Sequence, residues 1–142
     1  MRFITMGPEE FPTLLFIHGL STTAESCYGK VSRCLQDQWH IVLCELDGHY
    51  DGSPVFQSID DECKQIEAYV SENHQGRIHG MVGLSLGGTI AVSLLSRGRI
   101  LSKEQFWTPP SVWIWGSSKA AIAGFSQKAS QESVTESTCP VS

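Results

Sequence analysis

A serine held between two glycines is the feature of this sequence with the clearest chemical meaning. Gly83, Ser85 and Gly87 form a Gly-x-Ser-x-Gly pattern between an apolar run, residues 78–84, and a segment with helical periodicity, residues 87–96. Glycines on either side allow a sharp turn from strand to helix, and such a turn presents the serine hydroxyl to a substrate. A serine of this kind attacks ester, thioester or amide carbonyls and forms an acyl-serine intermediate.

Two other interpretations of the Ser85 pattern lead to different functions. A glycine-rich turn in which the serine only caps the following helix would carry no chemistry. A phosphate-binding loop is disfavoured, because no Lys-Ser or Lys-Thr pair follows the glycines and their spacing fits neither nucleotide-binding pattern. The strand-turn-helix context favours a nucleophile.

A second motif, His18-Gly19-Leu20, follows the apolar run of residues 14–17. Together with the Ser85 pattern, and in the same order along the chain, it resembles the α/β-hydrolase family over about residues 10–100. The segment from Glu45 to Ser53, which ends in Gly-His-Tyr-Asp-Gly-Ser at residues 48–53, is similar to the segment that follows the next strand of that family.

The resemblance implies an activity and a set of site residues. It implies a serine hydrolase that acts on carboxylic ester or thioester bonds of a small acyl substrate, with neither a metal nor an organic cofactor. Ser85 would be the nucleophile, and the backbone N–H groups of Leu20 and Leu86 would form the oxyanion hole. The residues that would support these positions are His18, Gly19, Gly83 and Gly87.

The residues that would complete a catalytic triad do not follow the nucleophile. In the family an Asp or Glu and then a His come after the serine, but no aspartate or histidine follows Ser85. A serine without a base is a weak nucleophile at neutral pH. Two interpretations stay open: His18 or His49 supplies the base, or the chain is a catalytically inactive truncated fragment or a non-catalytic binding protein.

Short apolar runs alternate with helical periodicity along the first hundred residues. The runs predict strands at residues 3–5, 14–17, 40–44 and 78–84, with helices between and after the last three. The patterns Thr22-x-x-Glu25 and Ser58-x-x-Asp61 predict two helix starts. This alternation predicts an α/β fold, a partial, doubly wound and mostly parallel sheet that is incomplete on its C-terminal side.

Composition argues against several classes of partner. The 142 residues carry a net charge of −5 without a basic stripe, so no nucleic-acid partner is expected. The sequence has no apolar run long enough to span a bilayer and no secretory signal, so a cytoplasmic protein is expected. The five cysteines are scattered without Cys-x-x-Cys pairs, so neither a disulfide framework nor a metal site is expected.

The sequence changes character after about Ile100. Three of the four tryptophans lie between residues 107 and 115, and the chain beyond them is rich in Ser, Ala, Thr and Gln. We expect residues 1–100 to form the N-terminal part of a hydrolase domain and residues 101–142 a divergent tail, disordered or read out of frame. With no later strand, the outer edge of the strand at residues 78–84 is expected to be unpaired.

The coding DNA tests whether the tail is read out of frame. Trp107-Thr108 must be written TGG-ACN, and a shift of two nucleotides turns it into Leu-Asp preceded by Ile or Val. An apolar strand ending in Leu-Asp is what the family places after the helix that Ser85 opens. We therefore expect resequencing across codons 95–115 to yield a one- or two-base correction that opens a frame with a strand-ending aspartate and a later histidine. A confirmed frame with nothing hydrolase-like downstream would make the tail genuine.

Overall fold

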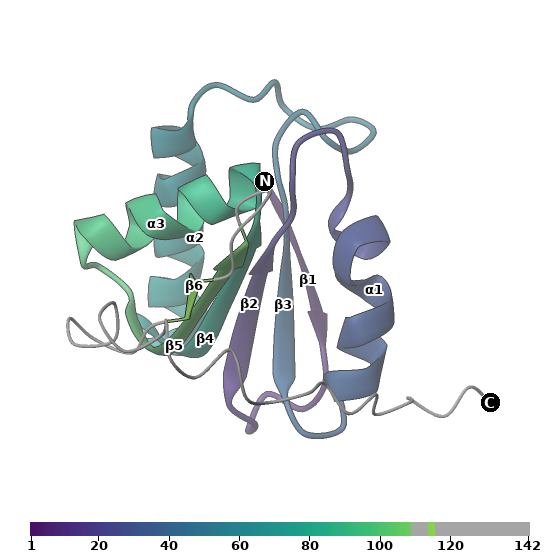
Figure 1. Cartoon of the computed structure of the whole chain (residues 1–142), viewed down its shortest axis with the longest axis vertical. Coiled ribbons are helices and arrows are strands. Elements are labelled where there is room, and N and C mark those ends of the chain that lie inside the picture. The colour runs from purple at the N-terminus through teal and green to yellow at the C-terminus, as the bar shows by residue number, and fades with distance from the viewer. Residues whose placement is uncertain (109–113, 116–142) are drawn as a thin grey trace.

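A mixed six-stranded sheet forms the centre of the chain (Figure 1). The computed structural model describes residues 1–108 and 114–115, with side chains up to residue 103. The strand order is β1-β3-β2-β4-β5-β6; the four middle strands are parallel, whereas β1 and β6 pair antiparallel with β3 and β5. The strands are β1 (Arg2–Met6), β2 (Thr13–Ile17), β3 (His40–Glu45), β4 (Arg77–Leu84), β5 (Leu101–Thr108) and β6 (Ile114–Trp115).

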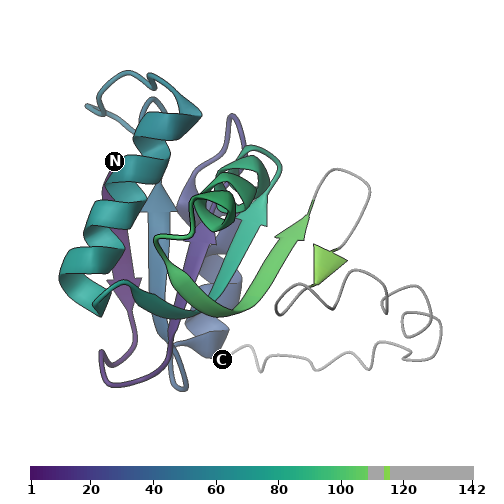
Figure 2. The ribbon, with the colours of Figure 1, turned by 90° about the vertical axis from the view of Figure 1, so that its left-hand side faces the viewer.

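Three helices cover the two faces of this sheet (Figure 2). They are α1 (Ala24–Leu35), α2 (Ile59–His74) and α3 (Leu86–Arg97). α1 lies on one face and packs on β2 and β3, while α2 and α3 lie together on the other face and both contact β4. In the part of the chain that the structure describes, no helix is both long enough and apolar enough to cross a membrane.

Alternate residues of the central strands point into two separate cores. Phe16 and Leu43 pack with Tyr28 on the α1 side, whereas Leu15 and Val42 belong to the larger core under α2 and α3. Strands buried on both faces read as continuous apolar runs, as they do in this sequence. The predicted α/β fold with a doubly wound, mostly parallel sheet is therefore confirmed.

The predicted start of α1 is wrong by one residue. Thr23 is the N-cap: its hydroxyl accepts the Ser26 N–H at 3.1 Å, and the Ser26 hydroxyl accepts the Thr23 N–H at 3.0 Å. Ser26 instead of Glu25 supplies the reciprocal bond of the capping box, so Thr22 is free for another partner. Ser58 caps α2 as predicted.

The outer edge of β4 is paired, contrary to the sequence-based expectation. β5 runs parallel to β4 over its whole length and extends the sheet past residue 100. A left-handed C-cap at Gly98 ends α3, and the Leu101 N–H then donates to the Gly76 carbonyl oxygen at 2.9 Å, which starts the new strand. This strand was not predicted because residues 102–105 are polar and form no apolar run. The remainder of the predicted tail, residues 109–113 and 116–142, lies outside the described residues.

Glycines at two positions allow α3 to approach the sheet closely. A Cβ added to Gly87 would overlap the Ile17 carbonyl oxygen and lie 2.6 Å from the His18 carbonyl oxygen. A Cβ added to Gly83 would overlap the Gly87 carbonyl oxygen. The glycines of the Ser85 pattern are therefore required by contact between backbones, since both have ordinary backbone angles.

Replacing Gly87 with alanine tests this close approach. Helix propensity alone predicts that Gly87→Ala stabilises α3 by about 1 kcal/mol, whereas overlap with two backbone carbonyls predicts a net loss of about 3 kcal/mol. We expect the free energy of unfolding, measured by urea denaturation, to fall. Gly52→Ala is the control: its Cβ would meet no atom within 4 Å, and its positive φ costs only about 1–2 kcal/mol. A Gly87→Ala chain as stable as the wild type would contradict the prediction.

Candidate active site

Ser85 occupies the turn between β4 and α3 in a strained backbone conformation. Its φ of 51° and ψ of −110° lie outside the regions that non-glycine residues usually adopt. The residue is exposed, and although it is the N-cap of α3 its hydroxyl makes no capping hydrogen bond. Helix capping therefore does not explain this serine. Strain of this kind persists where the surrounding structure imposes it, often at active sites.

The backbone of Gly19 packs against the turn that carries Ser85. A Cβ added to Gly19 would lie 3.3 Å from the Leu84 carbonyl oxygen and 3.6 Å from the Ser85 Cβ. The next backbone N–H, that of Leu20, has no hydrogen-bond acceptor within the described residues. Leu86 is the first residue of α3, where N–H groups lack an intrahelical partner. The two N–H groups expected to form an oxyanion hole are thus brought to the neighbourhood of Ser85.

His18 is fully buried, and both nitrogens of its ring are occupied. Nε2 accepts the Leu46 N–H at 3.0 Å, and Nδ1 lies 2.8 Å from the Gly19 carbonyl oxygen. Because an amide N–H can only donate and a carbonyl can only accept, the ring proton is on Nδ1. Burial lowers the pKa of His18 and outweighs the opposing effects of the Gly19 hydrogen bond and of Glu45. His18 is a neutral link between two loops and is not available as a base for Ser85.

His49, the other histidine considered as a base, lies beside His18. The two ring centroids are 5.1 Å apart, and His49 Nδ1 donates to the Asp47 carbonyl oxygen at 2.9 Å. The ring also meets Phe56 edge-on, with centroids 6.4 Å apart. Within the described residues no hydrogen bond joins His49 to Ser85, and these contacts hold the imidazole within its own loop.

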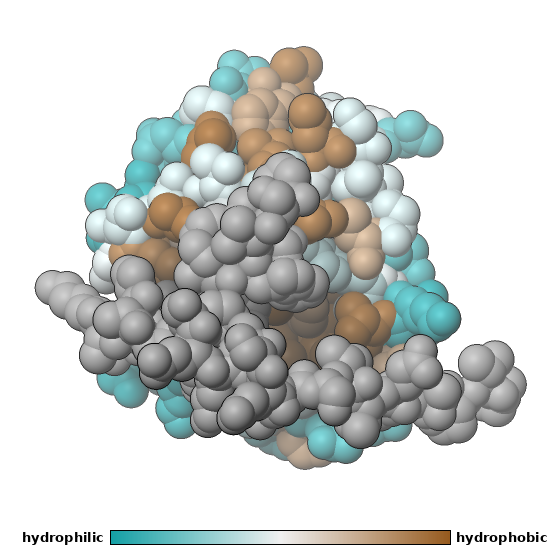
Figure 3. Space-filling model, in the orientation of Figure 1, coloured by the Kyte–Doolittle hydropathy of each residue, from teal (hydrophilic) through white to brown (hydrophobic). Residues whose placement is uncertain are grey.

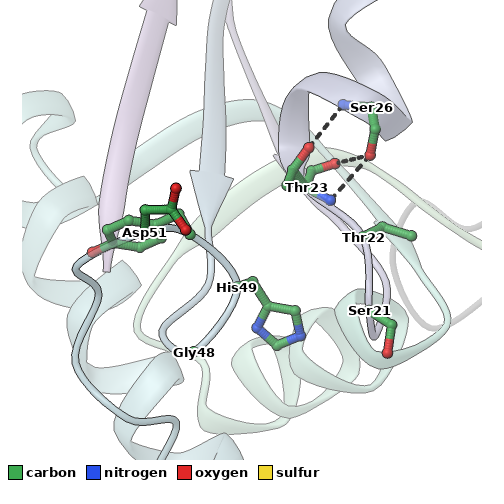
Figure 4. A pocket seen from close by; sticks show the side chains of 8 residues that line it. Ser21, Thr22, Thr23, Ser26, Gly48, His49 and Asp51 are labelled. Carbon is green, nitrogen blue, oxygen red and sulfur yellow. Dashed lines mark hydrogen bonds between the residues drawn. The ribbon is translucent and has the colours of Figure 1, made fainter.

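A polar pocket of about 520 Å³ opens between the loops that follow β2 and β3 (Figure 4). It lies at the carboxyl edge of the parallel strands, where open α/β sheets bind ligands. Several of its hydroxyl groups already have partners, as the dashed bonds between Thr23 and Ser26 show. The lining residues are Ser21, Thr22, Thr23, Ser26, Gly48, His49, Tyr50 and Asp51. No cluster of three or more metal-binding side chains occurs among the residues that the structure describes.

Apolar side chains are exposed around the same edge of the sheet. Leu20, Val55 and Leu84 each follow or end a parallel strand, and their exposed fractions are 66%, 74% and 36%. Figure 3 shows apolar residues gathered at the upper end of the molecule, the end at which the parallel strands of Figure 1 finish. The neighbourhood of Ser85 therefore combines the exposed apolar side chains of Leu20 and Leu84 with backbone N–H groups that have no acceptor among the described residues.

The sequence patterns did not predict the roles of two residues that organise the loop after β2. Glu45 is buried, and its carboxylate accepts the Ala24 N–H at the start of α1 at 2.9 Å. An acidic residue at the end of an otherwise apolar strand was the available signal. The Thr22 hydroxyl donates to the Gly19 carbonyl oxygen at 2.8 Å. The predicted capping box Thr22-x-x-Glu25 assigned the Thr22 hydroxyl to the start of α1, so this contact was not expected.

The protonation of His18 couples the stability of the fold to pH. An unfolded histidine takes up a proton near pH 6.5, whereas the folded protein resists protonation until a lower pH, so acidification favours the unfolded state. His74, whose pKa burial also lowers, acts in the same direction. We expect the free energy of unfolding to fall between pH 7.5 and pH 5.5, and to fall less in His18→Gln. Equal falls in the two proteins would show that His18 is not the neutral link described above.

Comparisons with known proteins agree with this geometry. Residues 12–103 match the family described as alpha/beta hydrolase fold. A 2-succinyl-6-hydroxy-2,4-cyclohexadiene-1-carboxylate synthase from Serratia proteamaculans is 33% identical over 92 residues, which cover 64% of this chain and 35% of that enzyme. An alpha/beta hydrolase family protein from Desulfitobacterium hafniense superposes with a TM-score of 0.71 at 24% identity, covering 75% of this chain and 43% of the other.

A thioesterase domain from the curacin biosynthetic pathway has a similar fold, with a TM-score of 0.65 at 23% identity over 75% of this chain and 40% of that domain. In each of these comparisons the chain spans less than half the length of its relative. The family match nevertheless covers well over half of the chain. This chain therefore belongs to the alpha/beta hydrolase fold family.

Proposed function

We propose that the chain carries the nucleophile and the oxyanion hole of a serine hydrolase that cleaves carboxylic ester or thioester bonds. The observation that supports this most directly is the combination found at Ser85. Ser85 is exposed and its hydroxyl makes no capping bond, its backbone is strained, and the N–H groups of Leu20 and Leu86, which have no acceptor among the described residues, lie close by. The names of similar proteins, which include an esterase and a thioesterase, agree with this class of reaction.

The reaction begins when the Ser85 oxygen attacks the carbonyl carbon of the substrate. The carbonyl oxygen becomes negatively charged, and the N–H groups of Leu20 and Leu86 stabilise it by hydrogen bonds. The tetrahedral intermediate then collapses, the alcohol or thiol leaves with a proton, and the acyl group remains on Ser85. Water hydrolyses the acyl-serine and restores the hydroxyl.

Proton transfer is the step for which this chain provides the least help. His18 uses both ring nitrogens in hydrogen bonds, and no aspartate or histidine follows Ser85 in the sequence. Within the described residues neither His18 nor His49 is hydrogen-bonded to Ser85, so we take water as the acceptor of the serine proton, which makes acylation slow. In serine proteases that have lost triad members, the oxyanion hole and binding alone leave a rate roughly 10³–10⁴-fold above that in water. We expect a rate of that order here.

The exposed apolar side chains favour an uncharged acyl group in the substrate. Leu20 and Leu84 adjoin the oxyanion donor and the nucleophile, so an alkyl chain bound there removes apolar surface from water. A short aliphatic acyl ester with an activated leaving group is therefore a suitable test substrate.

Hydrolysis of p-nitrophenyl butyrate tests the role of Ser85. We expect the wild-type chain to release p-nitrophenolate above the buffer rate and to form a butyryl adduct on the Ser85 peptide, detected by mass spectrometry. Ser85→Ala should lose the adduct and retain only the buffer rate. Ser93→Ala, which removes a hydroxyl bonded to the Thr89 carbonyl in the same helix, is the matched control and should behave like the wild type. Wild-type release no faster than that of Ser85→Ala would contradict the proposed function and leave a non-catalytic binding protein.

A further inference from the structure

Two hydrogen bonds converge on the carbonyl oxygen of Gly19. The His18 Nδ1–H and the Thr22 hydroxyl each donate to it, both at 2.8 Å. This oxygen belongs to the peptide group whose N–H is that of Leu20. Because a trans peptide group is planar, its C=O and N–H bonds point in opposite directions, and fixing one fixes the other.

The peptide group after Gly19 needs these hydrogen bonds to keep one orientation. The backbone at Gly19 lies so close to Leu84 and Ser85 that a side chain would press on the Leu84 carbonyl oxygen. A glycine meets this demand for space, but without a Cβ its peptide groups rotate more freely than those of other residues. The Gly19 backbone by itself would therefore not hold the Leu20 N–H toward an oxyanion.

We propose that Thr22 is a positioning residue whose hydroxyl fixes the Gly19–Leu20 peptide group, and thereby aims the Leu20 N–H at the oxyanion. The consequence for catalysis rests on the function proposed for Ser85. Thr22 does not touch the reacting atoms; it acts through the Gly19 carbonyl oxygen.

The Thr22 hydroxyl oxygen also lies 3.4 Å from His18 Nδ1, but that nitrogen carries the ring proton and cannot accept, so the Gly19 carbonyl oxygen is the acceptor of the hydroxyl proton. The Cys27 thiol donates to the Thr22 oxygen at 3.2 Å, so the hydroxyl accepts from one side and donates to Gly19 on the other. The adjacent Thr23 performs the capping of α1, which leaves Thr22 free of that task. Figure 4 places Thr22 on the loop between Ser21 and Thr23, at the edge of the polar pocket.

Thr22 can be tested separately from His18 because the two differ in burial. His18 is fully buried and linked to Leu46, so its removal perturbs the fold as well as the Gly19 peptide. Thr22 is only partly buried, and Thr22→Val removes the hydroxyl with little change of shape. Thr22→Ser restores the hydroxyl. Thr5→Val makes the same chemical change at an exposed position of β1, far along the chain from the site, and serves as the matched control.

The first measurement follows the peptide group itself and does not depend on catalysis. We expect Thr22→Val to shift the Gly19 carbonyl ¹³C resonance to lower frequency, as loss of a hydrogen bond requires, and to move the Leu20 amide ¹⁵N resonance. Thr22→Ser should restore both resonances, and Thr5→Val should leave them unchanged. Unchanged Gly19 and Leu20 resonances in Thr22→Val would overturn the proposal.

The second measurement uses Ser85-dependent hydrolysis of p-nitrophenyl butyrate. Removal of a complete oxyanion donor costs about 10²–10³ in kcat, so loosening one should lower kcat by roughly 10-fold in Thr22→Val, with KM within about 2-fold and recovery in Thr22→Ser. An unchanged kcat together with shifted resonances would overturn the positioning role. If the wild-type chain shows no Ser85-dependent hydrolysis, only the function proposed for Ser85 is contradicted. The resonances still decide whether Thr22 holds the peptide group.

Discussion

The contact between the first turn of α3 and the carboxyl end of β2 is the constraint on which the rest of the site depends. Because Gly87 has no side chain, the α3 backbone reaches the carbonyl groups of Ile17 and His18. The Gly19 backbone in turn packs against Leu84 and Ser85, immediately before Leu86. Protein interiors are packed as densely as organic crystals, so a shift of α3 would disturb the core beneath it as well as the turn at Ser85. Stability and site geometry are therefore linked through backbone contacts.

A neutral histidine, His18, links the loop after β2 to the residue that follows β3. His18 joins the Leu46 N–H after β3 to the Gly19 carbonyl after β2, and it can do so only as the Nδ1–H tautomer. Glu45 holds the start of α1 in the same region by accepting the Ala24 N–H. A buried polar network in which each group has a partner specifies one arrangement, whereas a broken one is costly. The loop that carries Leu20 is thus held by buried groups of His18 and Glu45.

Local patterns in the sequence were sufficient for most elements and for the turn at Ser85. The apolar runs and the helical periodicity predicted β1 to β4 and all three helices, because buried strands read as continuous apolar runs and helices as a 3.6-residue period. The glycines around Ser85 predicted its sharp turn, although Gly87 is required by its contact with Ile17 and His18, which are distant in the sequence. β5 was missed, since its polar residues carry no apolar period and its pairing with β4 is a long-range interaction. The N-cap of α1 was predicted one residue too early, because Thr22 and Thr23 are equally suitable N-cap residues by type.

The sequence by itself determined four of the strands, the helices and the turn that carries Ser85, since each is indicated by residues within a few positions of one another. Only the tertiary structure decided the roles of His18, Glu45 and Thr22. His18 receives the Leu46 N–H from 28 positions away, and Glu45 meets Ala24 across 21 positions. Thr22 is only three residues from Gly19, but its hydroxyl is free to bond there because Thr23 caps α1 in its place. These roles depend on which donors and acceptors folding brings within hydrogen-bond distance, and residue type alone does not contain that information.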